Sequence, residues 1–261
     1  MNDIDEARDW QGNEFTCAGC RHEAAAPATR CQLKHACVQD RYARRIDRFF
    51  DWNPELANSY VRHPHFEVRA IAAKHADVFM LPPLLDDPDE TVRWNAARRL
   101  PKRYILPLRQ DPHREVRIRI VGLLDDAELG PLMLDPDYYV RLVVARRIAP
   151  FHLTRMINDD EPEVRRVIAR RVPFDWLFRL IEDPDPLVRL EVAKRLAPDL
   201  LVRLKSDPDW RVRFEAASRI PFPLLDPLAD DDDTLVREAA RARLPGGRDP
   251  IRNDQIKETA P

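Results

Sequence analysis

Residues 183–198 read DPDPLVRLEVAKRLAP, and the same pattern returns along most of the 261-residue chain. Its anchor is a Val-Arg pair that recurs at a constant spacing of 24 residues, without one insertion. A fixed period of this kind is the mark of a repeat architecture, in which neighbouring units stack and bury a continuous core. The eight pairs begin at Val68, Val92, Val116, Val140, Val164, Val188, Val212 and Val236.

The first half of each repeat has the signals of an α-helix. Asp stands five residues before the valine in seven of the eight repeats, often followed by Pro as in Asp183-Pro184, and His63 takes this place in the first repeat. An Asp cap with Pro at the first helical position predicts that the helix begins there. Apolar residues then follow on one helical face, and a proline nine or ten residues after the valine limits the helix to about three turns.

The second half of each repeat keeps two apolar residues three positions apart, as in Leu201 and Leu204. This spacing suits a short 3₁₀ helix or a single helical turn. The stretch is rich in proline and poor in β-branched residues, which argues against a strand. The sequence therefore predicts an all-α solenoid of eight 24-residue repeats, each an α-helix plus a short 3₁₀ helix.

All four cysteines lie near the N-terminus in the pattern Cys17-x2-Cys20-x10-Cys31-x5-Cys37. The chain shows no secretory signal, so the cluster indicates metal binding before disulfides. Four thiolates can ligate one Zn²⁺ or one iron–sulfur cluster. Structural zinc usually has two C-x2-C pairs and only one is present, so the spacing favours iron–sulfur and leaves zinc open. With four cysteines available, the nearby His22 and His35 are not expected to be ligands.

The core D-P-D-x-x-V-R-x-x-x-A-x-R-[LI]-P at period 24, behind a cysteine cluster, resembles the leucine-rich repeat variant family over residues 15–245. The resemblance implies a right-handed superhelix of alternating α and 3₁₀ helices without β-sheet. It also implies a [4Fe-4S] cluster, here held by Cys17, Cys20, Cys31 and Cys37. The family implies no settled biochemical activity, and this chain departs from it mildly at His63, Asp125 and Pro162.

The expected domain organisation follows the changes in pattern along the chain. We predict a four-cysteine iron–sulfur module over residues 1–40 and connecting or capping helices over 41–62. The eight-repeat solenoid is expected over 63–245, and a mobile polar tail over 246–261.

The arginine that follows each repeat valine lies about 100° around the helix, inside the apolar sector. A charge in that place needs a partner, and the Asp residues five and three positions before the valine are the candidates. We therefore predict an Arg–Asp ladder between repeats. The alternative is a row of guanidinium groups open to an acidic partner or a phosphate backbone.

Two further sets of side chains are assigned to the surface and to the interior. A second basic row is expected to form a solvated helix surface, and several aromatic residues are expected to fill the core or grooves. The basic row is Arg98-Arg99, Arg146-Arg147, Arg170-Arg171 and Lys194-Arg195, and the aromatic residues are Trp94, Trp176, Trp210 and Phe214.

The composition and the catalytic motifs that the sequence lacks reduce the number of function classes to consider. The formal charge is only −2, which speaks against a generally basic nucleic-acid binder, and no apolar stretch is long enough to span a membrane. The sequence contains no Walker loop, G-x-S-x-G, H-E-x-x-H or dinucleotide fingerprint. We predict a cytoplasmic, non-enzymatic scaffold that binds another protein through a curved repeat surface, with a cluster in a structural or redox-sensing role. The alternatives are a nucleic-acid-binding repeat protein and a redox or electron-transfer protein.

Overall fold

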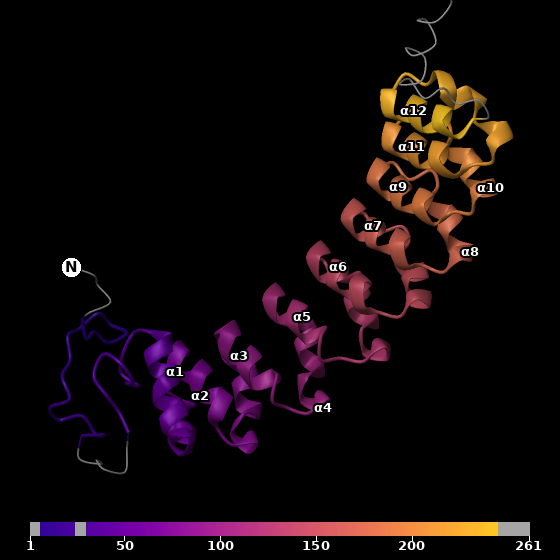
Figure 1. The fold of residues 1–261 in the computed structure, drawn as a ribbon. Coiled ribbons are helices and arrows are strands. Elements are labelled where there is room, and N and C mark those ends of the chain that lie inside the picture. The colour runs from indigo at the N-terminus through magenta and orange to yellow at the C-terminus, as the bar shows by residue number, and fades with distance from the viewer. Residues whose placement is uncertain (1–5, 24–29, 245–261) are drawn as a thin grey trace, which may run out of the picture. The chain divides into compact units, whose positions relative to one another are not determined.

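The computed structural model describes residues 6–23 and 30–244, and every helix in this part of the chain is an α-helix or a 3₁₀ helix (Figure 1). The only extended pairing found there consists of three isolated bridges near the N-terminus. The chain divides into a first unit that ends at Leu132 and a second unit that begins at Met133. The predicted tail, residues 246–261, lies outside the described residues.

The first unit contains the cysteine-bearing segment, two N-terminal helices and the first repeats. Helices α1 and η2 occupy the region in which connecting or capping helices were predicted. The elements are α1 (Ala43–Trp52), η2 (Pro54–Tyr60), α2 (Phe66–His75), η3 (Val78–Met80), η4 (Pro82–Asp86), α3 (Glu90–Ala97), α4 (Lys102–Ile105), η5 (Leu106–Gln110), α5 (Arg114–Ile120) and η6 (Asp126–Glu128). The chain passes to the second unit within η7 (Gly130–Leu134).

The second unit is a stack of repeat helices, each ten residues long, with short helices between them in the sequence. Figure 1 shows α8 and α10 on the opposite side of this stack from α7 and α9. The long helices are α6 (Tyr138–Arg147), α7 (Pro162–Arg171), α9 (Pro186–Arg195), α11 (Trp210–Arg219) and α12 (Thr234–Arg243). The short ones are η8 (Pro150–Met156), α8 (Phe174–Leu177), η9 (Phe178–Leu180), α10 (Pro198–Leu201), η10 (Val202–Leu204), η11 (Phe222–Leu224) and η12 (Asp226–Asp230).

The core of each unit is the apolar set read from the repeat. All eight repeat valines are at most 1% exposed, and the paired apolar residues of the short helices, such as Leu201 and Leu204, are also buried. This confirms the predicted repeat of one α-helix followed by a short helical segment, which most repeats divide into two short helices. None of the helices in the described ranges combines the length and apolar character that crossing a bilayer demands.

The helices begin two residues later than the sequence predicted. In the repeat of α9, Asp185 is the N-cap, and its Oδ1 accepts the backbone N–H groups of Leu187 at 2.8 Å and Val188 at 3.2 Å. The earlier Asp183 lies ahead of the helix and accepts the N–H of Asp185 at 2.9 Å. The expectation that the first Asp caps the helix was wrong, because that carboxylate is engaged by an arginine of the preceding repeat.

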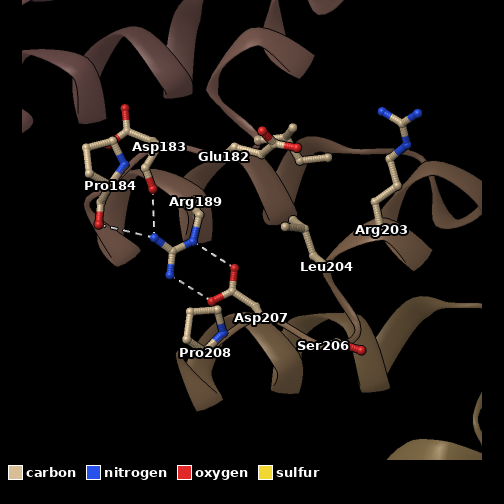
Figure 2. Close-up of a pocket in the computed structure, with 10 residues that line it drawn as sticks. Glu182, Asp183, Pro184, Arg189, Arg203, Leu204, Ser206, Asp207 and Pro208 are labelled. Atoms are coloured by element: carbon tan, nitrogen blue, oxygen red, sulfur yellow. Dashed lines mark hydrogen bonds and ion pairs between the residues drawn. The ribbon is translucent and has the colours of Figure 1, made fainter.

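This pairing is the predicted Arg–Asp ladder. The guanidinium of Arg189 donates from Nε to Asp207 Oδ2 at 2.7 Å and from Nη2 to Asp207 Oδ1 at 2.8 Å (Figure 2). Its Nη1 donates to the carbonyl oxygens of Asp183 at 2.7 Å and Pro184 at 3.2 Å. The same two-pronged contact joins Arg69 to Asp87, Arg93 to Asp111, Arg141 to Asp159, Arg165 to Asp183 and Arg213 to Asp231.

The ladder confirms that the partner is the first Asp of the next repeat. Every guanidinium nitrogen in these six contacts donates within the chain, so the alternative of an open arginine row is not supported for them. The hydrogen bond from Arg213 holds the pKa of the Asp231 carboxyl below its ordinary value. Two-pronged contacts between a planar guanidinium and a carboxylate fix relative orientation as well as distance, so the ladder sets the register between neighbouring repeats.

The second basic row is only partly a solvated surface, because Arg99, Arg171 and Arg195 bind backbone carbonyls of the preceding repeat, whereas Arg147 is exposed as expected. Arg195 donates from Nη1 to Ala169 O at 2.7 Å and from Nη2 to Val172 O at 2.8 Å. These carbonyls lie at the C-terminal end of α7, where a helix leaves its last carbonyls without partners and favours positive charge. Arg99, Arg171, Arg219 and Arg243 bind the end of the preceding repeat helix in the same way.

The exposed members of the row are Arg98, Arg146, Arg147, Arg170 and Lys194. The aromatic residues that were expected to fill the core or grooves are not all covered. Trp176 and Phe214 are 37% and 38% exposed, whereas Trp94 and Trp210 are half-buried.

His63 replaces the first aspartate of the ladder. Its Nδ1 accepts the backbone N–H of His65 at 3.1 Å. Asp183 likewise accepts the backbone N–H of the residue two positions after it, Asp185. Burial lowers the pKa of the His63 ring, which favours the neutral form that such an acceptor requires. The substitution therefore keeps the local turn and removes the charge.

Candidate metal centre

The four cysteines come together around one cavity. Cys17, Cys20, Cys31 and Cys37 all carry free thiols, and all four line this cavity together with the side chain of Phe49 from α1. Cys17 and Cys31 are exposed, while Cys20 and Cys37 are half-buried. The structure thus brings together two cysteine pairs that the sequence separates.

Each pair is associated with a tight turn. The backbone N–H of Cys20 donates to Cys17 O at 3.0 Å, and Gly19 within that turn has a φ of 74°. Between Cys31 and Cys37 the chain doubles back, because Gln32 and Ala36 exchange backbone hydrogen bonds of 2.9 and 2.8 Å. Both turns carry cysteines that line the cavity.

Helix α1 holds the segment that carries Cys31 and Cys37 in place. Asn53 at its C-terminal end is 1% exposed, and its Nδ2 donates to Arg30 O at 2.7 Å while its Oδ1 accepts the Arg30 N–H at 2.8 Å. This contact spans 23 residues and fixes the backbone next to Cys31. The carbonyl of Arg45 accepts the N–H of Cys37 at 3.1 Å. The positions of the second cysteine pair therefore depend on α1.

The two histidines named from the sequence occupy different places. His22 is buried, lines the cysteine cavity and forms a 2.5 Å hydrogen bond with the Tyr60 hydroxyl. Burial lowers the pKa of the His22 ring. His35 instead contacts Arg48, whose Nη1 lies 2.9 Å from its Nδ1, and packs against the ring of Trp52. That neither ring is a ligand stays a prediction.

The pKa values of two of the thiols are raised, so metal binding at this site requires the loss of tightly held protons. Burial raises the pKa of the Cys37 thiol to about 11, and burial together with the neighbouring Cys17 and Cys20 raises that of Cys31. Thiolates are the metal ligands, so a bound metal centre must displace these protons and compensate several like charges. Gln39 adds a donor that the sequence did not single out, since its Nε2 lies 3.4 Å from Cys20 Sγ.

The donor set fits a centre held by cysteine alone. Four thiols surround one cavity, and an amide donor reaches one of the sulfurs. Within residues 6–23 and 30–244, no three His, Cys, Asp or Glu side chains are grouped closely enough to hold a single metal ion.

The stacked repeats and the cysteine-lined segment before them define a helical repeat protein with a four-cysteine module. Residues 7–59 match the family model described as "LRV protein FeS4 cluster". A solved structure, described as a leucine-rich repeat variant with a novel repetitive protein structural motif, is 40% identical with a TM-score of 0.82. The match covers 88% of this chain and 99% of that one. The chain belongs to the leucine-rich repeat variant family.

A curated relative shares part of the sequence. The chain is 48% identical over 96 residues to a Rhodobacter capsulatus protein named "Uncharacterized 27.7 kDa protein in nifB 3'region". The matched segment is 37% of this chain and spans 39% of the length of that protein. The solved structure supports the fold, and the family match over residues 7–59 supports the iron–sulfur module.

Proposed function

We propose that the protein is a non-enzymatic scaffold whose repeats bind another protein. The observation that carries this proposal is the set of large apolar side chains that the short helices expose. Phe79 is 89% exposed and Phe151 is 63% exposed, and Phe178 is 53% exposed. Large apolar side chains exposed on the short helices are available to a partner, and repeat proteins commonly bind partners through the surfaces of their stacked repeats.

We propose further that the N-terminal module holds a [4Fe-4S] cluster through Cys17, Cys20, Cys31 and Cys37. When bound there, the cluster would supply one-electron redox chemistry and a covalent link between the two cysteine turns. Asn53 fixes the turn that carries Cys31, and Gln39 donates toward the sulfur of Cys20. A cluster with four thiolate ligands leaves no open position for a substrate, which supports a role other than catalysis.

A structural role of the cluster is supported by the small apolar core of the module. Between residues 30 and 41, only Ala36 and Val38 are buried apolar side chains. Segments that bury so little are commonly held by disulfides or by a metal centre. A cytoplasmic location fits such a site, because thiols stay reduced there.

A redox-sensing or electron-transfer role is supported by a separate feature. Cys17 and Cys31 are exposed, so one side of the centre faces solvent and can be approached by an oxidant or an electron donor. Nucleic-acid binding through the ladder has less support, since its guanidinium groups are occupied by aspartates.

The scaffold proposal is tested by partner capture from anaerobically lysed native cells. We expect the isolated repeats, residues 63–245, to bind the native partner with at most about tenfold lower affinity, or roughly 1.4 kcal/mol, than the intact protein. Binding should survive moderate salt better than nucleic-acid binding does, because few counterions are released. If the isolated repeats show full helical signal but capture nothing, the N-terminal module is the recognition element.

A further inference from the structure

The short helices of the second unit repeat a specific pair of side chains. Twelve residues after the repeat valine stand Trp176 and Leu200, and three residues further along each short segment stand Arg179 and Arg203. Arg155 holds the same position one repeat earlier, and Leu224 continues the apolar row one repeat later. Two parallel rows result, one apolar and one basic, on consecutive repeats.

Local geometry places the two rows on the same surface. Residues three apart lie on the same side of a single helical turn, whether α or 3₁₀. The structure shows this directly at one repeat, where the guanidinium carbon of Arg179 lies 4.9 Å from the centre of the Trp176 ring. Trp176, Leu200 and Leu224 are 37%, 41% and 37% exposed, and the three arginines are exposed.

The three arginines differ from those of the ladder. In the part of the chain that the structure describes, Arg155, Arg179 and Arg203 form no hydrogen bond or ion pair, and the Arg179 guanidinium lies over the Trp176 ring. Figure 2 shows Arg203 extending away from the Arg189–Asp207 pair on the other side of the pocket. These charges hold nothing together within the repeats, so the fold does not account for their recurrence.

We infer that this strip, made of Trp176, Leu200, Leu224, Arg155, Arg179 and Arg203, binds an acidic protein segment with interspersed apolar side chains. The apolar side chains of the segment would cover Trp176 and the leucines, and its carboxylates would pair with the arginines. This inference rests on the proposed scaffold function and names the surface and the chemistry of the partner. Arginine and tryptophan are also the residue types that contribute most at protein interfaces.

The charge pattern favours a protein segment over a nucleic acid. Each repeat contributes at most one arginine to the strip, and the exposed Asp175 and Asp199 stand beside the apolar row in the sequence. A continuous phosphate backbone would face these carboxylates, whereas a protein segment can place its acidic residues at the arginines alone.

The test is a selection from a displayed random-peptide library on the anaerobically purified full chain. We expect the enriched peptides to combine Asp or Glu with Leu, Phe or Trp. A synthetic copy of the best peptide should bind the triple variant Arg155→Glu, Arg179→Glu, Arg203→Glu at least about tenfold more weakly. The matched control is Arg146→Glu on α6, an exposed site outside the strip, which should change the affinity by no more than about twofold.

Three results would overturn the strip as the binding surface. The enriched peptides could be basic, or there could be no enrichment. Alternatively, the peptides could bind with unchanged affinity to a triple variant that keeps its circular dichroism spectrum. In that case the scaffold proposal would still hold, but with a different binding surface. Binding of labelled single-stranded DNA that is lost in the triple variant would assign the strip to nucleic acid instead. Capture of the native partner tests the scaffold proposal separately.

Discussion

Replacing Arg189 by Met is expected to lower the free energy of unfolding by about 3 kcal/mol. Arg189 is 8% exposed and Asp207 is 7% exposed, so the substitution would leave the carboxylate buried without its counter-charge. The carbonyl of Asp183 would also lose the donor that lies 2.7 Å away. Methionine fills much of the volume of the arginine stem, which makes the loss of polar contacts the main effect.

Urea denaturation followed by circular dichroism measures this loss. The matched control is Arg146→Ala, an exposed arginine on α6, which should cost about 0.5 kcal/mol or less. Adding Asp207→Leu to Arg189→Met should recover part of the stability, because removing both partners of a buried pair costs less than removing one. Recovery should be incomplete, since Asp207 also accepts the N–H of Asp209 at 2.8 Å. Equal losses at Arg189 and Arg146 would contradict the assignment of the two positions.

Replacing Cys31 by Ser is expected to abolish the iron–sulfur cluster while the repeats remain folded. Cys31 supplies one of the four thiols around the cavity, and serine oxygen is a poor substitute for thiolate in such a centre. The repeat helices bury their own valines and leucines, so they do not depend on the metal for a core. Absorption in the visible range reports the cluster, and circular dichroism reports the helices.

Thr16→Ser provides the control for this variant. Thr16 lines the same cavity without contributing a thiol, so its replacement should leave the visible spectrum in place. A full cluster in Cys31→Ser would show that another residue, such as His22, completes the ligand set. Loss of helical signal throughout the chain would show that the repeats need the module to fold.

The fold was predictable because the same pattern of helix signals and apolar positions occurs in eight consecutive repeats. The valines, the paired leucines and the Arg–Asp ladder could all be read from the 24-residue period. The error at the helix start arose because two aspartates compete for one role. Only the structure shows that Asp183 accepts hydrogen bonds from Arg165 and that Asp185 is the N-cap of the helix.

The side chains that contact a neighbouring repeat through its backbone were harder to predict. Arg195 has the spacing of an exposed helix residue, yet it reaches the carbonyls of Ala169 and Val172. The sequence shows no partner for such an arginine, because its partners are backbone carbonyls, which every residue has and no residue type marks. The exposure of Trp176 was missed for a related reason, since a large aromatic residue is assigned to the interior unless its neighbours are known.

The cysteine module was predictable in its ligand types and not in its geometry. The four cysteines indicated a metal centre, but the contact between Asn53 and Arg30 joins residues without any repeating pattern. Gln39 likewise approaches Cys20 only through the turn that follows Cys37. Irregular segments of this kind are defined by individual contacts, which a single sequence does not reveal.

The iron and acid-labile sulfide content of the anaerobically purified protein tests most directly whether the four cysteines of this repeat protein hold a cluster. We expect brown protein with about four iron and four sulfide per chain, and Mössbauer spectra of a [4Fe-4S] centre. Removal of the metal should expose four thiols to titration with a thiol reagent. Colourless protein that contains one zinc per chain and no sulfide would contradict the assignment.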